Sequence, residues 1–168
     1  MVRILGIDPG LRFTGWGVIE ARDNRLSHVA DGVIATDAAM SVPLRLRHLH
    51  DALLELGRGF APDEAAIEET YVNRNGAATL KLGYARGVGL LVPVLLDIPV
   101  SEYGAKSVKR SVVGTGAATK EQVEMMVRRL LPTAIAKRSD AADALAVAIC
   151  HAHHRASAAH IARATRMA

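Results

Sequence analysis

The chain has 168 residues, of which 50% are hydrophobic and 23% charged, so it is long and apolar enough to form a globular domain and is not a disordered protein. Its 21 lysines and arginines outnumber 17 aspartates and glutamates, and the net charge of +4 is compatible with a polyanionic partner. A single cysteine excludes an internal disulfide and a zinc site built from cysteines.

Neither a targeting segment nor a membrane segment is expected. The N-terminus leads directly into a strand-like apolar run, without the successive regions of a signal peptide. The longest uncharged apolar run, Gly87 to Leu96, has ten residues and contains Pro93, whereas a membrane-spanning helix needs roughly 20 apolar residues. We therefore expect a cytoplasmic protein with no membrane partner.

The first part of the sequence predicts three strands that follow one another as an antiparallel meander. An apolar strand over residues 2–7 ends in an Asp-Pro-Gly turn. The alternating segment 14–19 predicts a second strand, and residues 26–36 predict a third. Leucines at helical spacing then predict an amphipathic helix that begins near Pro43, a residue suited to a first helical turn.

Strands and helices alternate in the rest of the chain. We expect a strand over 64–69, a helix from about Ala77 toward Leu96 and a short strand over 99–103. A capping box at Thr119 opens a helix that ends at Pro132, and Ser139 caps the last helix. Three antiparallel strands followed by this alternation predict an α/β fold with a mixed sheet.

Four acidic residues lie in unusually apolar or small-residue surroundings in three separate segments: Asp8, Glu68, Asp140 and Asp143. A carboxylate at the end of a buried strand is costly unless a cation compensates it. Carboxylates gathered at one point repel each other, and a hard divalent cation relieves that repulsion. If the three segments converge, they form a cage for two Mg²⁺ or Mn²⁺ ions of the kind used in phosphodiester hydrolysis.

Each of these acids also has a plainer interpretation. Aspartate is common in turns that end strands, and the same turn as at Asp8 opens actin-like ATPases, where it meets phosphates. Asp140 and Asp143 fit an ordinary acidic helix N-terminus, although the apolar residues after them indicate a buried helix. Glu68 and Glu69 face opposite sides of a strand, so only one can reach Asp8, and the alternation does not say which.

Basic side chains are concentrated in two acid-free stretches. Between Gly104 and Lys120 they are Lys106, Lys109, Arg110 and Lys120. Such a run is usually a solvated face, but beside an acidic pocket it would follow a phosphate backbone. After Asp143 no acid occurs, and we expect residues 155–168 to be a basic, frayed tail beyond a single domain over residues 1–154.

Two further kinds of side chain are candidates for contacts with a ligand. Tyr71, with Arg74 close behind it, could stack on an unpaired base, and a core tyrosine is an equally good interpretation. The histidines near the end of the chain, among them His151 and His154, are too far along the last helix to join the carboxylates. We interpret them, with His153 and His160, as surface residues or auxiliary phosphate contacts, and favour the surface.

A set of motifs occurs in order between about residue 3 and His151: Ile4–Gly10, Thr14–Ile19, Ala66–Glu68, Leu80–Gly83 with Ala85–Gly87, Val108-Lys109 with Val112–Gly114, and Asp140–Ala146. Together they resemble the bacterial RuvC Holliday junction resolvases. The resemblance implies a ribonuclease H-like fold, with a mixed five-stranded sheet and helices on both faces. It also implies a homodimer that uses Mg²⁺ or Mn²⁺ to make paired symmetric nicks in four-way junction DNA, in recombination and repair.

The resemblance also implies roles for individual residues. By motif, the family's catalytic and metal-binding carboxylates correspond to Asp8, Glu68, Asp140 and Asp143, which favours Glu68 over its neighbour. Tyr71 replaces the commoner phenylalanine that stacks on junction bases. Lys109 and Lys120 fall on the family's DNA-contacting lysines. Beyond what the resemblance implies, we also expect DNA contacts from Arg74, Lys81, Lys106 and Arg110. A branch-migration helicase complex is a partner by implication of the family only.

Two other functions fit the sequence less well. An actin-like nucleotide-binding protein needs two lobes, and 168 residues supply one. A junction-binding protein without catalysis would gain nothing from a concentrated negative pocket, because its ligand is a polyanion. The sequence therefore favours a metal-dependent DNA endonuclease.

Overall fold

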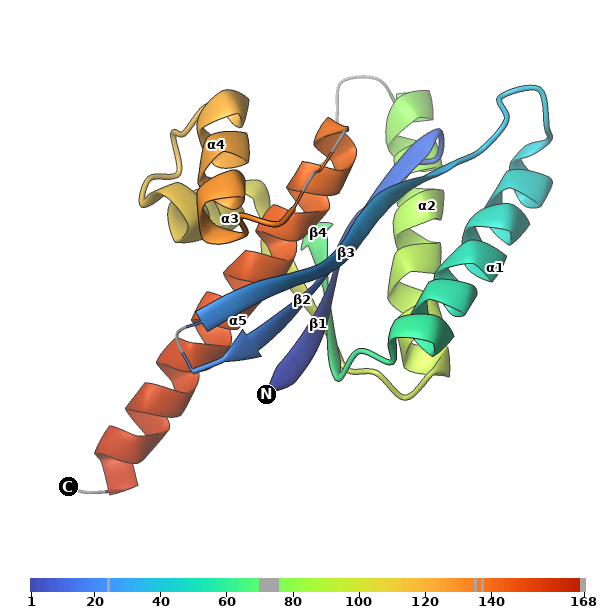
Figure 1. The fold of residues 1–168 in the computed structure, drawn as a ribbon. Helices are drawn as coiled ribbons and strands as arrows, with labels where there is room; N and C mark the ends of the chain where they lie inside the picture. The colour runs from blue at the N-terminus through green and yellow to red at the C-terminus, as the bar shows by residue number, and fades with distance from the viewer. Residues whose placement is uncertain (24, 70–75, 135, 137, 167–168) are drawn as a thin grey trace.

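The computed structural model describes residues 1–166 except 24, 70–75, 135 and 137. Within these residues, five strands form one mixed sheet in the order β3-β2-β1-β4-β5. Figure 1 shows how the sheet lies among the helices. The strands are β1 (Val2–Asp8), β2 (Phe13–Arg22), β3 (Arg25–Ala35), β4 (Glu64–Glu69) and β5 (Val100–Gly104). Strands β1, β2 and β3 pair as an antiparallel meander, and β4 and β5 continue the sheet in parallel from β1.

Helices cover both faces of this sheet (Figure 1). Helices α1 (Val42–Phe60) and α2 (Gly76–Leu95) lie on one face. The other face carries α3 (Ala105–Val113), α4 (Lys120–Leu130) and α5 (Ser139–Arg166). Because apolar strand residues point alternately to the two faces, the sheet separates two hydrophobic cores. The expected mixed five-stranded sheet with helices on both faces is confirmed.

Helix α5 lies directly on β1 and β2 because glycines there leave room for its backbone. A Cβ atom at Gly6 would collide with the carbonyl oxygen of Ala144, and one at Gly15 with that of Asp140. The first turns of α5 are therefore placed against the ends of the two central strands. This close approach puts the helix N-terminus beside Asp8, which lies opposite Gly15 in the β1–β2 register.

Two segments differ from the sequence-based expectation. Helix α3 is not predicted, because its two buried residues, Val108 and Val112, are too few to make a clear helical pattern among charged neighbours. Helix α5 continues to Arg166, through the segment expected to be a frayed tail. After Asp143 this segment has many alanines and no glycine or proline, so nothing in it interrupts a helix.

Candidate active site

Carboxylates from three elements meet at one end of the sheet. Asp8 is the last residue of β1, and its partner Gly15 on β2 contacts the backbone of Asp140. Asp143 follows one helical turn later on the same side of α5. The acids of the first strand and of the last helix, far apart in sequence, are therefore neighbours in the fold.

The sheet register determines which glutamate of β4 joins this group. Ala66 lies beside Gly6 and belongs to the core under α5, whereas Ile67 belongs to the core on the opposite face. Since side chains alternate along a strand, Glu68 faces α5 with Ala66, and Glu69 faces the other side. The expectation that Glu68 lies with the other acids agrees with this geometry.

The electrostatics of the cluster oppose full ionisation. Burial, reinforced by the negative charges of Glu68, Asp143 and Asp140, raises the pKa of Asp8 to about 8. Burial and the charge of Asp143 also raise the pKa of Glu68. The four carboxyl groups are thus too close together to be fully ionised with only the protein's own cations beside them.

Two lysines flank the cluster on the β4 side. Lys120 Nζ lies 2.7 Å from Asp143 Oδ2, and this hydrogen bond raises the pKa of the lysine. Lys109 and Lys120 line a hollow of about 220 Å³ together with Glu68 and Asp143. Among the expected DNA contacts that the structure describes, these two lysines are the ones whose charges act on Glu68 and partly offset the rise of its pKa.

An arginine that the sequence does not single out flanks the cluster on its other side. Arg138 Nε lies 3.5 Å from Asp140 Oδ2, and its guanidinium carbon lies 3.9 Å from the ring centroid of Phe13. Asp140 and Asp143 are thus each paired with a cation, one from either side of the cluster. No sequence signal could have linked Arg138 to Phe13, which belong to distant segments.

Three other expected DNA contacts lie at the surface. Lys106 and Arg110 are exposed on α3, and Arg110 borders a separate hollow with His153 and His154. Lys81 is exposed on α2. Tyr71 and Arg74 lie outside the described residues.

A second group of polar residues, formed by β4, β5 and α5, has no counterpart in the sequence-based expectations. His151 is 7% exposed; its Nε2 lies 2.6 Å from Glu64 Oε2 and its Nδ1 lies 2.8 Å from the hydroxyl of Tyr103. Arg155 Nε donates to the other oxygen of Glu64 at 2.9 Å. The expectation that His151 lies at the surface is wrong, because it packs under β4 and β5, where partners satisfy both ring nitrogens.

The donor set of the cluster fits hard divalent cations. It offers carboxylate oxygens, the ligands that Mg²⁺ and Mn²⁺ prefer, and its mutual repulsion is the kind that such an ion relieves. In the described part of the chain, no three such side chains already surround one point closely enough to hold an ion. The pairs of Asp143 with Lys120 and of Asp140 with Arg138 occupy oxygens that a metal would need.

Comparisons with known proteins identify one family. Residues 4–151 match the family model of crossover junction endodeoxyribonuclease RuvC. The protein of that name from Gluconacetobacter diazotrophicus is 73% identical over 168 residues, which are 100% of both chains. The one from Granulibacter bethesdensis is 73% identical over 99% of this chain and 94% of its own.

Solved structures give the same result. A structure of Thermus thermophilus RuvC in complex with a Holliday junction substrate superposes with a TM-score of 0.88 at 32% identity. The match covers 94% of this chain and 97% of the other, and it confirms the expected ribonuclease H-like fold. By sequence and by fold alike, the chain belongs to the family of crossover junction endodeoxyribonuclease RuvC.

Proposed function

We propose that this protein is a metal-dependent endonuclease that resolves four-way DNA junctions by paired symmetric nicks. The observation that carries the proposal is the cluster of four carboxylates, in which the pKa of Asp8 is raised to about 8. A protein without a cationic ligand gains nothing from such a cluster. Family membership and the Holliday junction bound in the Thermus thermophilus complex support a four-way junction as the DNA substrate.

The residues that would hold two Mg²⁺ or Mn²⁺ ions are Asp8, Glu68, Asp140 and Asp143. When bound, such ions lower the pKa of a water molecule and stabilise the charge on the leaving oxygen. Asp8, at the end of β1 and beside the start of α5, would contribute its carboxylate to this metal site. Lys120 and Arg138 would release their carboxylates as the ions bind.

Cations around the cluster would hold the DNA. Lys120, once freed from Asp143, can pair with the phosphate that is cut, and Lys109 can pair with a neighbouring phosphate in the same hollow. We assign outer phosphate contacts to Lys81, Lys106 and Arg110, which are exposed around this region. Tyr71 and Arg74 are assigned to stacking and phosphate contact from the sequence alone.

Paired nicks need two active sites, and α2 offers a surface on which two copies can meet. Its exposed residues Leu80, Tyr84, Gly87, Leu91 and Val94 repeat at alternating spacings of four and three. Residues at this spacing form the contact surface, or seam, between two equivalent packed helices.

Helix α2 is also long and apolar enough to cross a membrane, and only 22% of its apolar window is buried. Lys81 and Arg86 within it favour a second protein chain over lipid.

A matched pair of substitutions tests this dimer. Leu91→Glu puts a charge into the seam, and Met125→Glu puts one on α4, where Met125 is 61% exposed and Leu91 is 52% exposed. Analytical ultracentrifugation should find dimers for the wild type and Met125→Glu, and monomers for Leu91→Glu. A wild type that is monomeric at micromolar concentration would contradict the dimer.

The proposed activity is tested by incubating the protein with a synthetic four-way junction, a duplex of matched sequence and a replication-fork analogue. Each reaction contains Mg²⁺, Mn²⁺ or a chelator. We expect symmetric nicks of two strands in the junction alone, and none with the chelator. Equal cutting of the duplex would overturn the junction specificity.

A cellular setting follows from the substrate. Junction DNA arises from chromosomal recombination, so we place the protein in the cytoplasm with the chromosome. A branch-migration helicase is the partner that the family suggests, since junctions must be moved to a cutting site. Co-purification of such a helicase with the tagged protein, dependent on junction DNA, would support that partnership.

A further inference from the structure

Phe13 carries two arginines on its ring, beside the carboxylate cluster. The guanidinium carbon of Arg138 lies 3.9 Å from the ring centroid, and that of Arg12 lies 5.3 Å from it. Both arginines are exposed, and Phe13 is partly buried. A guanidinium that lies on an aromatic face keeps its N–H edge available for hydrogen bonds. The ring therefore orients two cations without using their donors.

The turn that carries Arg12 and Phe13 is fixed by buried partners. The carbonyl of Arg12 accepts a hydrogen bond from the N–H of Thr36 at 3.0 Å. The buried Arg45 donates to the carbonyl of Leu11 at 3.2 Å. Because the turn is already ordered, the protein backbone loses little conformational entropy there when its side chains bind a ligand.

The sheet places these arginines on the flank of the cluster opposite Lys120. Phe13 lies two residues before Gly15 on β2, so both point to the face covered by α5. Lys120 instead lines a hollow with Glu68 of β4, on the other side of β1. A DNA strand whose phosphate enters the cluster would thus meet cations on both sides.

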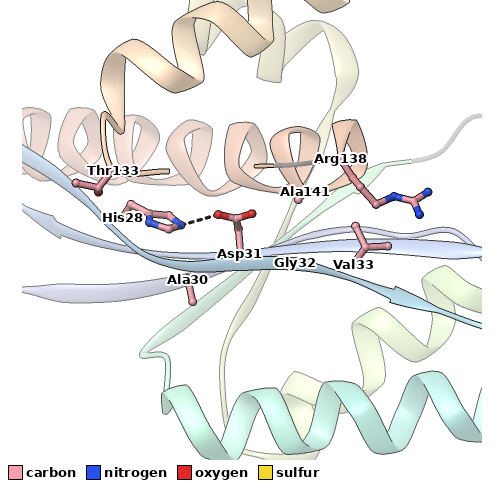
Figure 2. Close-up of a pocket in the computed structure, with 8 residues that line it drawn as sticks. All are labelled: His28, Ala30, Asp31, Gly32, Val33, Thr133, Arg138 and Ala141. Carbon is pink, nitrogen blue, oxygen red and sulfur yellow. Dashed lines mark hydrogen bonds and ion pairs between the residues drawn. The ribbon is translucent and has the colours of Figure 1, made fainter. Parts of the chain in front are cut away.

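There is open space for an anion next to Arg138. The arginine lines an open hollow of about 580 Å³ between β3 and the start of α5. In Figure 2 its side chain extends beside Val33, while His28 and Asp31 lie together farther along β3. The carboxylate of Asp31 is engaged by His28 at 2.7 Å, so it is not the partner of Arg138.

Two guanidinium groups on one ring repel each other, and a phosphate between them would remove that repulsion. Arg138 pairs with Asp140 through Nε, at 3.5 Å from Oδ2, and this pair does not use its two terminal NH₂ groups, which can bind a phosphate whether or not a metal ion is present. We propose that Arg12 and Arg138, oriented by Phe13, together bind one DNA phosphate next to the phosphate that is cut. This inference rests on the proposed function, because it takes DNA as the ligand.

The test measures DNA binding without metal, so it does not depend on cutting. Affinities of Arg12→Ala, Arg138→Ala and the double variant are determined by fluorescence anisotropy over a series of salt concentrations, with chelator present. The DNA is a four-way junction or a duplex of matched sequence. Arg47→Ala is the matched control, because Arg47 is an exposed arginine that lies 3.6 Å from Asp51 on the opposite face of the sheet.

Each single variant should weaken binding roughly five-fold and lower the slope of log affinity against log salt by about 0.9, the value for one phosphate contact. Because both arginines bind the same phosphate, the double variant should lose no more slope than either single variant. Phe13→Leu should weaken binding by a smaller factor, since it keeps the packing but removes the aromatic face. Arg47→Ala should behave like the wild type.

Unchanged affinity and slope in both single variants would overturn the proposal, as would a double variant whose slope falls by twice the single-variant amount. A wild type that binds junction and duplex equally would instead count against the proposed function. In that case the loss of slope on the duplex would still show that the arginines bind a phosphate.

Discussion

Glu64 and Glu68 lie on the same face of β4, yet their surroundings shift the pKa values of the two carboxyls in opposite directions. Burial disfavours the charge of Glu64, but hydrogen bonds from Arg155 and His151 outweigh it and lower the pKa of this carboxyl. At Glu68, burial and the charge of Asp143 raise the pKa, and Lys120 and Lys109 counter this only in part. Arg155 and His151 thus compensate the charge of Glu64 within the protein. The charge of Glu68 is compensated only in part, so a cation from outside the protein would stabilise it. We infer from this difference that Glu64 has a structural role and that Glu68 is a metal ligand.

The largest effect should come from removing the charge at each of these positions. Glu68→Gln should reduce junction cutting by about 10³-fold or more, because it removes a proposed metal ligand, while junction binding changes little. Glu64→Gln should leave cutting within about three-fold of the wild type, because both oxygens of Glu64 are already engaged by His151 and Arg155. Single-turnover cleavage assays measure both. Equal losses in the two variants would remove the distinction between the carboxylates.

The free energy of unfolding of the metal-free protein should depend on pH because of Asp8. Its pKa is about 8 in the folded protein and 3.8 for an aspartate side chain free in water, so the folded state binds the extra proton between these values. The stability that this proton provides is fully present below about pH 4 and is lost as pH rises through about 8. We expect the free energy of unfolding to fall by on the order of 2–5 kcal/mol over this range.

Urea unfolding with a chelator measures this dependence, and Asp8→Asn is the control that should flatten it. Saturating Mg²⁺ should restore the stability of the wild type at about pH 8, because the ion binds the ionised carboxylates. A wild-type curve as flat as that of Asp8→Asn would show that the cluster is not strained by its charges.

A smaller effect is expected on stability, where Glu64→Gln should be more destabilising than Glu68→Gln. Glu64→Gln leaves Arg155 and the buried His151 without a charged partner, so the free energy of unfolding should fall by about 1–3 kcal/mol. Glu68→Gln should leave stability unchanged or raise it at about pH 8, because it removes a charge that is repelled. Unfolding in urea at fixed pH compares the two, and a greater loss in Glu68→Gln would reverse our assignment.

Much of this fold follows from local sequence patterns. The strand over 64–69 is predicted correctly because Ala65-Ala66-Ile67 is apolar and bounded by charged residues and a Pro-containing loop. The long helix α2 is predicted from its apolar composition. By contrast, α3 has only two buried residues, and its N-cap is Gly104, which makes no side-chain cap.

The site was predictable where it depended on acids in apolar segments, and less so where it depended on register. Alternation alone could not choose between Glu68 and Glu69, because the choice needs the partner strand: Gly6 beside Ala66 defines the face under α5. Likewise, the contact of Arg138 with Phe13 depends on where α5 begins relative to β2. Such contacts between distant segments leave no pattern in a single sequence.

The most direct test of the central claim is the pKa of Asp8 itself, followed by ¹³C NMR of its carboxyl carbon. In the metal-free protein we predict a midpoint near 8, as burial and its acidic neighbours require. With saturating Mg²⁺, the same carboxyl should stay ionised down to at least about pH 5, because the ion stabilises the charged form. A midpoint near 4 without metal, or a midpoint that Mg²⁺ does not move, would contradict the account.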